Sequence, residues 1–191
     1  MPHPDKIEDK TDEEIVRLSL ENKENYLWLM KRYENKLLRY ILRLTNYPKE
    51  DAEDILQEVF IKAYLNLNDF NRNLKFSSWI YRICHNEVIS HWRKMKVRPQ
   101  MTELIDNNLK FSTNAPIYKE LEIKLNKGKI NEVLNQIPLK YREVLVLRYW
   151  DEKDYNEMAD ILRVPLGTVG TLLNRAKKSF KEMTIKQNIN F

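Results

Sequence analysis

The scarcity of glycine is the sequence feature that most constrains the fold of this chain. Only three glycines occur in 191 residues, while Leu, Lys, Glu, Ile and Asn are abundant. A glycine inside a helix costs on the order of 1 kcal/mol relative to alanine, so this composition favours helices. No segment shows the alternation of apolar and polar residues that is typical of a half-buried strand. We therefore predict an all-α protein.

Composition excludes several classes of protein. With 42% hydrophobic and 32% charged residues, the chain suits a globular protein with a modest core. No apolar run approaches the roughly 20 residues that span a bilayer, and the acidic, polar N-terminus does not resemble a signal peptide. The lone Cys84 cannot form an internal disulfide, which favours a reducing compartment. We expect a cytoplasmic protein.

Helix signals divide the chain into two modules. Thr11-Asp-Glu-Glu14 is a capping box and predicts a helix from about residue 12. Helical spacing of apolar residues predicts further helices over about 27–44, 52–67 and 79–96, the last capped by Ser77. Periodicity weakens over 98–117, where Pro, Asn, Ser and Thr cluster. The predicted architecture is two small helical domains, 1–97 and 118–191, joined by the linker 98–117.

The C-terminal module has the ingredients of a helix-turn-helix. Helical pattern resumes over 118–136, and Pro138 opens another helix. A second capping box, Asp154-Tyr-Asn-Glu157, starts a short helix. The turn at Val164-Pro165 then leads into a basic helix, which completes the motif.

The basic helix that follows the turn carries two glycines and a polar face. We expect Gly167 to lie where the two helices approach most closely, whereas Gly170 has no comparable explanation. With Val169, Leu172 and Leu173 packed inward, the outward side chains are Thr168, Thr171, Asn174, Arg175 and Lys178. Such a face can enter a major groove, with early residues at base edges and later ones on phosphates. The alternative is a plain helical hairpin with an exposed basic helix.

The segment 70–96 combines side chains that suit unpaired DNA. A polar loop precedes a helix that interleaves aromatic and basic residues; the loop holds Asn71, Arg72, Asn73 and Lys75, and the helix holds Trp79, Tyr81, Arg82, Trp92, Arg93, Lys94 and Lys96. Base stacking on aromatic side chains contributes about 1–3 kcal/mol per base. The alternative is a core role for Trp79 and Trp92.

Cys84, His85 and His91 do not form a predicted metal site. Cys84 and His85 are adjacent and point in different directions, and no second cysteine completes a zinc set. We therefore predict no metal and no other cofactor.

The C-terminal module resembles region 4 of the extracytoplasmic-function (ECF) sigma factors. The resemblance runs through "LNQIPLKYREVLVLRYWDEKDYNEMADILRVPLGTVGTLLNRAKKSF". It implies that the five outward residues Thr168, Thr171, Asn174, Arg175 and Lys178 read the −35 promoter element. The chain departs from the family pattern at Gly170 and Leu172, where basic residues are common, and at Arg163, which replaces the usual turn glycine.

The N-terminal module resembles sigma region 2. "AEDILQEVFIKAY" is similar to region 2.2, which implies that Asp54, Gln57 and Glu58 contact the clamp coiled-coil of the largest RNA polymerase subunit. "FNRNLKFSSWIYRICHNEVISHWRKMK" is similar to regions 2.3 and 2.4, which recognise and melt the −10 element. The implied −10 residues are Asn71, Arg72, Asn73, Lys75, Trp79, Arg82, Asn86 and Arg93. Ser90 stands where the family commonly has aspartate.

The sequence thus predicts an alternative sigma factor rather than an enzyme. The resemblance implies that core RNA polymerase (clamp coiled-coil and flap), promoter DNA and an anti-sigma factor, often membrane-bound, are its partners, with no small-molecule substrate. A free-standing helix-turn-helix repressor is the alternative, but it leaves the region-2-like segments without a role and shows no dimerisation heptad. A nucleic-acid enzyme ranks last, because helical spacing spreads Asp51, Glu53 and Asp54 around their axis.

Overall fold

The computed structural model describes residues 7–71, 74–97 and 128–187. In these residues every regular element is a helix, which confirms the all-α prediction. None of the described helices is long and apolar enough to cross a membrane. The predicted linker 98–117 lies outside the described residues, and the helix predicted over 118–136 is described, as helix, over 128–136.

The N-terminal module is built from four α-helices in chain order. They are α1 (Asp12–Glu21), α2 (Tyr26–Thr45), α3 (Lys49–Leu65) and α4 (Phe76–Val97), with short 3₁₀ turns at Lys23–Asn25 and Leu67–Asp69. The capping box at the start of α1 is confirmed, because the Thr11 amide donates to Glu14 Oε2 at 2.9 Å and the Glu14 amide donates to Thr11 Oγ1 at 3.3 Å. Local signals therefore set this helix start.

The start of α4 differs from the prediction. The helix begins at Phe76, and Ser77 lies inside it, so the prediction that Ser77 is the N-cap was wrong. The Phe76 amide donates instead to Glu13 Oε1 of α1 at 3.0 Å, while the Ser77 hydroxyl donates to Glu157 Oε1 at 3.3 Å. A carboxylate from another helix satisfies the first turn here, which a local pattern does not reveal.

The core of the N-terminal module is aromatic where α2 and α4 meet. Tyr33, Phe70, Phe76 and Trp79 form a cluster whose ring centroids lie 5.3–5.6 Å apart, in edge-on and tilted pairs. All four are buried. Aromatic pairs contribute about 0.5–1.5 kcal/mol each beyond the area they bury, so this cluster fixes the first turns of α4 against the bundle.

The C-terminal module comprises α6 (Leu139–Tyr149), α7 (Tyr155–Leu162) and α8 (Leu166–Lys186), preceded by helical residues 128–136. Pro138 is the N-cap of α6, as predicted. The second capping box is also confirmed, with the Asp154 amide donating to Glu157 Oε2 at 3.1 Å and the Glu157 amide donating to Asp154 Oδ1 at 2.8 Å.

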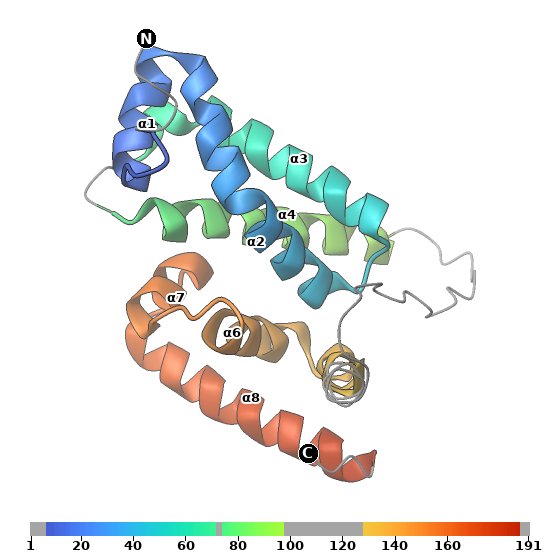
Figure 1. The fold of residues 1–191 in the computed structure, drawn as a ribbon. Coiled ribbons are helices and arrows are strands. Elements are labelled where there is room, and N and C mark those ends of the chain that lie inside the picture. Colours follow the sequence, from blue (N-terminus) through green and yellow to red (C-terminus); the bar gives the residue numbers. More distant parts are fainter. Residues whose placement is uncertain (1–6, 72–73, 98–127, 188–191) are drawn as a thin grey trace, which may run out of the picture.

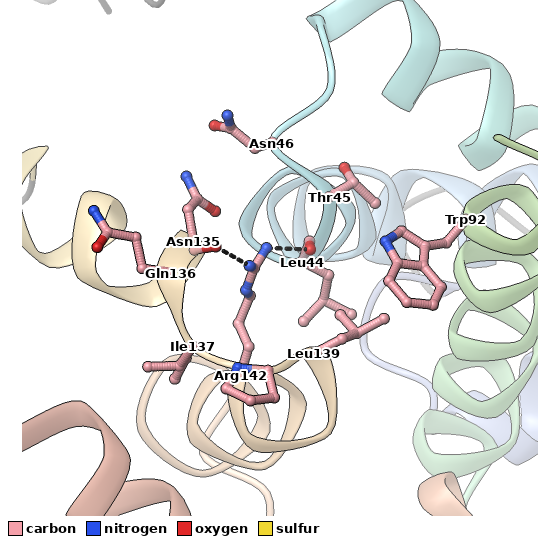
Figure 2. A pocket seen from close by; sticks show the side chains of 10 residues that line it. Leu44, Thr45, Asn46, Trp92, Asn135, Gln136, Ile137, Leu139 and Arg142 are labelled. Atoms are coloured by element: carbon pink, nitrogen blue, oxygen red, sulfur yellow. Dashed lines mark hydrogen bonds between the residues drawn. The ribbon is translucent and has the colours of Figure 1, made fainter. Parts of the chain in front are cut away.

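The two modules pack against each other. Figure 1 shows α2 and α4 lying over α6 and α7, with α8 on the far side of the C-terminal module. Buried apolar residues of both modules form one continuous core. At one edge of the contact, the Arg142 guanidinium donates to the Leu44 carbonyl at 2.6 Å and to the Asn135 carbonyl at 2.7 Å, beside a cavity of about 450 Å³ (Figure 2).

Candidate nucleic-acid interface

The turn between α7 and α8 has helix-turn-helix geometry. Arg163 ends α7 in the left-handed conformation, with φ 53° and ψ 48°. The Val164 amide donates to the Ala159 carbonyl at 3.2 Å, and Pro165 precedes the first residue of α8 in an extended conformation. The chain therefore reverses within three residues, which places α8 across α7.

The α8 helix has one buried and one exposed face, as its sequence pattern predicts. Val169, Leu173 and Ala176 are buried against α6 and α7. The predicted −35 residues are all exposed: Thr168, Thr171, Asn174, Arg175 and Lys178. Thr168, Thr171, Arg175 and Lys178 follow one another at intervals of three or four residues, with Asn174 next to Arg175, which places the set along one side of the helix. The structure thus brings the whole predicted set onto one accessible face.

Two residues of this face have partners within α8. The Thr171 hydroxyl donates to the Gly167 carbonyl at 3.2 Å, and Lys178 Nζ lies 3.9 Å from Glu182 Oε1. Both interactions are exposed and separate in water at little cost. Thr171 and Lys178 are therefore available to exchange these partners for DNA groups.

The two glycines of α8 do not follow the steric interpretation. A Cβ at Gly167 would have no heavy atom within 4 Å, so the expected close helix approach at this residue is wrong. Gly167 lies in the exposed first turn of α8, ahead of the buried contact that begins at Val169. A Cβ at Gly170 would lie 3.8 Å from Tyr155 Cε2, an ordinary van der Waals contact. Neither glycine has a positive φ.

The predicted −10 residues are distributed between surface and core. Asn71, Asn86 and Arg93 are exposed and Arg82 is half-buried, whereas Arg72 and Asn73 lie outside the described residues. Trp79 is 8% exposed and belongs to the aromatic cluster, the core role that the sequence left open for it. Lys75 is exposed, and its ammonium lies between the carboxylates of Asp154, the N-cap of α7, and Glu157 in the first turn of α7.

The predicted polymerase-binding residues lie together on the outer side of α3. Asp54 and Gln57 are exposed. Glu58 Oε2 lies 3.1 Å from His91 Nε2 of α4, and this hydrogen bond lowers the pKa of the Glu58 carboxyl. The opposite side of α3 is buried in the core and includes Ala52, Ile55 and Val59. The outer face therefore does not contribute to the core.

Titratable side chains are buried where the two modules meet. His85 Nδ1 of α4 lies 3.9 Å from Glu143 Oε1 of α6. Burial lowers the pKa of His85 to about 4 and raises the pKa of Glu143 to about 7. The Tyr81 hydroxyl donates to Asp151 Oδ1 at 2.9 Å, and burial raises the pKa of Asp151. Desolvation disfavours the charged form in each case.

Sequence reasoning missed these inter-module residues. The sequence does contain a signal for Arg142 and Glu143. They are two adjacent charged residues inside the apolar run of α6, and such charges must either face water or find buried partners. The sequence contains no such signal for Tyr81 and Asp151, because their hydrogen bond joins residues 70 positions apart. Cys84 is fully buried beside them, and within the described residues no three potential metal ligands gather.

The helix-turn-helix and the aromatic–basic helix together define a two-module DNA-binding protein. Its family follows from comparison with known proteins. The model of Sigma-70 region 2 matches residues 29–98, and the model of Sigma-70 region 4 matches residues 127–180. The matches cover both modules in chain order.

Similar proteins agree with these matches. The chain is 33% identical over 157 residues to the ECF RNA polymerase sigma factor SigW of Bacillus subtilis, covering 78% of this chain and 83% of that protein. It is 32% identical over 162 residues to the sigma factor YlaC of the same organism, covering 83% and 91%. The chain therefore belongs to the ECF sigma factors of the sigma-70 family.

Solved structures show the same fold. The structure of CnrH in complex with the cytosolic domain of CnrY matches with a TM-score of 0.70 at 20% identity, covering 93% of this chain and 99% of that chain. The sigma factor RpoE of Bartonella quintana, in complex with the anti-sigma factor NepR, matches with a TM-score of 0.64 at 19% identity, covering 84% and 96%. The protein is an alternative sigma factor that directs transcription initiation, and it is not an enzyme.

Proposed function

We propose that this chain reads the −35 element with the exposed face of α8. The single observation that supports this most strongly is the division of α8 into a buried apolar side and an accessible Thr/Asn/Arg/Lys side. Thr168 and Thr171, near the N-terminus of α8, are placed to meet base edges, with Arg175 and Lys178 on phosphates. The positive end of the helix dipole adds attraction for phosphate.

The N-terminal module supplies the other contacts of the proposed function. Asp54, Gln57 and Glu58 on α3 bind the clamp coiled-coil of core polymerase, and the C-terminal module meets the flap. Asn71, Lys75, Arg82, Asn86 and Arg93 act at the −10 element. The proposed domains 1–97 and 118–191 agree with the two family matches, with 98–117 as the linker.

An anti-sigma factor is part of this proposal. Two similar solved structures, CnrH with CnrY and RpoE with NepR, are of complexes with such partners or their domains. The same kind of regulator, often membrane-bound, would hold this chain inactive. Because core polymerase and the chromosome share the bacterial cytoplasm, the proposed function places the chain there.

The test combines binding with transcription. Purified chain is added to bacterial core RNA polymerase, and transcripts are mapped from a fragmented genomic library. Association with discrete new start sites would support the proposal. Specific binding to duplex DNA without polymerase association would contradict it and favour the free-standing repressor.

A matched pair of variants then isolates the −35 contact. Arg175→Ala on the reading face should weaken binding to duplex −35 DNA while leaving polymerase association intact. Lys129→Ala removes an exposed charge from the same module but off that face, and should leave both intact. Equal loss of DNA and polymerase binding in Arg175→Ala would contradict the assignment.

A further inference from the structure

The helix α1 contacts the chain on both sides of Asn71 and Lys75, two residues that the proposed function assigns to the −10 element. It contacts the 3₁₀ turn Leu67–Asp69, which ends just before Asn71, and it contacts α4, which begins just after Lys75. The family match to region 2 begins at residue 29, so α1 lies outside the matched part of the chain. The proposed function gives this helix no role.

Two contacts from α1 converge on Phe76, the first residue of α4. The Phe76 amide donates to Glu13 Oε1 at 3.0 Å. The second contact runs through α2, because the Tyr33 hydroxyl donates to the Asp12 carboxylate, and the Tyr33 ring packs edge-on against the Phe76 ring with centroids 5.6 Å apart. Neighbouring carboxylates of α1 thus hold the backbone of Phe76 directly and its side chain through Tyr33.

The helix α1 is itself anchored to the N-terminal module. Ile15 and Val16 are fully buried in the core. The Arg32 guanidinium of α2 donates to Asp12 Oδ1 at 2.5 Å, and to two backbone carbonyls of the segment before α1 at 2.9 and 3.0 Å. A functional surface is precise only when the residues that support it are held in place. Glu13 meets this condition, because it projects from a fixed helix.

The two sides of the −10 residues are also tied to each other. The rings of Phe70 and Phe76 pack edge-on with centroids 5.5 Å apart. The Leu74 amide donates to the Asn71 carbonyl at 2.9 Å. The side chains of Asn71 and Lys75 are exposed. Because Phe76 follows Lys75 directly, the position of Phe76 sets where Lys75 lies relative to Asn71.

We infer that Glu13 is a positioning residue for −10 recognition, which acts through the Phe76 amide and does not itself touch DNA. An amide in the first turn of a helix has no partner within that helix, and a carboxylate that accepts its hydrogen bond also interacts favourably with the helix dipole. Without this acceptor the first turn of α4 frays, and Lys75 loses its fixed place beside Asn71. The inference rests on the proposed function for the role of Asn71 and Lys75.

Substitutions at Glu13 provide the test. Glu13→Ala removes the acceptor, while alanine favours the helical backbone of α1 and leaves its capping box in place. Glu13→Gln keeps the length of the side chain and an acceptor oxygen, so it should retain the contact. Glu13→Asp keeps the charge but shortens the side chain, and it serves if Glu13→Ala folds poorly. The matched control, Glu21→Ala, removes an exposed carboxylate from the other end of α1.

Hydrogen exchange of the Phe76 amide, followed by NMR in the full chain, tests the contact itself. The exchange rate should rise about 5-fold in Glu13→Ala, the factor expected when a helix loses one capping interaction. It should stay near the starting value in Glu13→Gln and in Glu21→Ala. An unchanged rate in Glu13→Ala would overturn the inference, because the Phe76 amide would then not depend on Glu13.

The second readout is the selectivity of the holoenzyme for its −10 element. It is the ratio of affinities for two promoter fragments, one with the −10 sequence found upstream of the mapped start sites and one with a single base changed in it. This ratio should fall about 5-fold in Glu13→Ala and be restored in Glu13→Gln, with duplex −35 binding and core association unchanged. A merely structural role would lower the active fraction and weaken binding to both fragments equally, which leaves the ratio unchanged.

The outcomes distinguish this inference from the proposed function. If the starting holoenzyme selects the matched fragment and Glu13→Ala selects it equally well, the inference fails and the proposed function stands. An equal fall of the ratio in Glu13→Ala and Glu21→Ala would also contradict the inference, because the effect would then not depend on the Phe76 contact. If the starting chain does not associate with core polymerase, the proposed function fails, and the inference fails with it.

Discussion

At the scale of single residues, the buried pair of His85 and Glu143 has opposite pH effects. Burial raises the pKa of Glu143 from 4.5 to about 7, so its contribution to stability is full below pH 4.5 and is lost as the pH rises through 7. Burial lowers the pKa of His85 from 6.5 to about 4, so its contribution increases as the pH rises over that range. The two effects largely offset each other in the native protein.

In the Glu143→Gln variant, the pH dependence of stability should show the contribution of His85 alone. The amide keeps the size of the side chain but does not titrate, so the free energy of unfolding of the variant should rise as the pH rises from about 4 to 6.5, the range set by His85. The native protein loses the Glu143 contribution between pH 4.5 and 8, and the variant does not. The difference in unfolding free energy between variant and native protein should therefore increase by on the order of 3 kcal/mol from pH 4.5 to pH 8, at 1.36 kcal/mol per pKa unit. Urea unfolding from pH 4.5 to 8 measures this, with the exposed Glu21→Gln as control. If the unfolding free energies of variant and native protein changed with pH in parallel, the prediction would be contradicted.

At the scale of elements, helix ends were predictable where their signals are local. The capping boxes at Thr11 and Asp154 lie within four residues, and both are confirmed. The start of α4 was not predictable, because Glu13 of α1 caps it across the fold. The reading face of α8 followed from its periodicity, whereas burial of Trp79 depends on packing against Phe70 and Phe76, which a helical pattern alone leaves open.

The turn of the helix-turn-helix offers a prediction at this scale. Arg163 adopts φ 53° at the end of α7, a conformation that costs a residue with a Cβ about 1 kcal/mol and glycine almost nothing. Arg163→Gly should therefore raise the free energy of unfolding by about 1 kcal/mol in thermal or urea unfolding. Arg163→Ala removes the same charge but keeps the Cβ, and should give no such gain. Equal changes in unfolding free energy for the two variants would show that the charge of Arg163, rather than its positive φ, determines the effect on stability.

Gly170 gives a second prediction for the same motif. Its φ is not positive, and a Cβ would meet Tyr155 at an ordinary 3.8 Å, so nothing within the described chain requires glycine there. Gly170→Ala should stabilise α8 by about 1 kcal/mol. Gly170→Lys should strengthen duplex −35 binding if the missing side chain limits affinity. A less stable Gly170→Ala protein in thermal unfolding would contradict the steric argument.

At the scale of the whole molecule, the two modules were predictable and their packing was not. Each module follows from apolar periodicity and local caps. The contact between them depends on pairs far apart in sequence, such as Arg142 with the Leu44 carbonyl and Tyr81 with Asp151. A sequence pattern shows that Arg142 and Glu143 interrupt an apolar run, but not which surface receives them.

The Tyr81 hydroxyl tests how strongly this contact couples the modules. Tyr81→Phe keeps the ring and removes the donor to Asp151, whose Oδ2 atom is already buried without a hydrogen-bond partner. Leaving a buried carboxylate less satisfied should lower the free energy of unfolding by about 1–3 kcal/mol. The control, Tyr64→Phe, removes a hydroxyl from a 41% exposed ring and should cost far less. Urea unfolding followed by circular dichroism measures both losses. Equal losses would mean that the hydroxyl adds nothing to the contact, and the modules would then be held together by their apolar core alone.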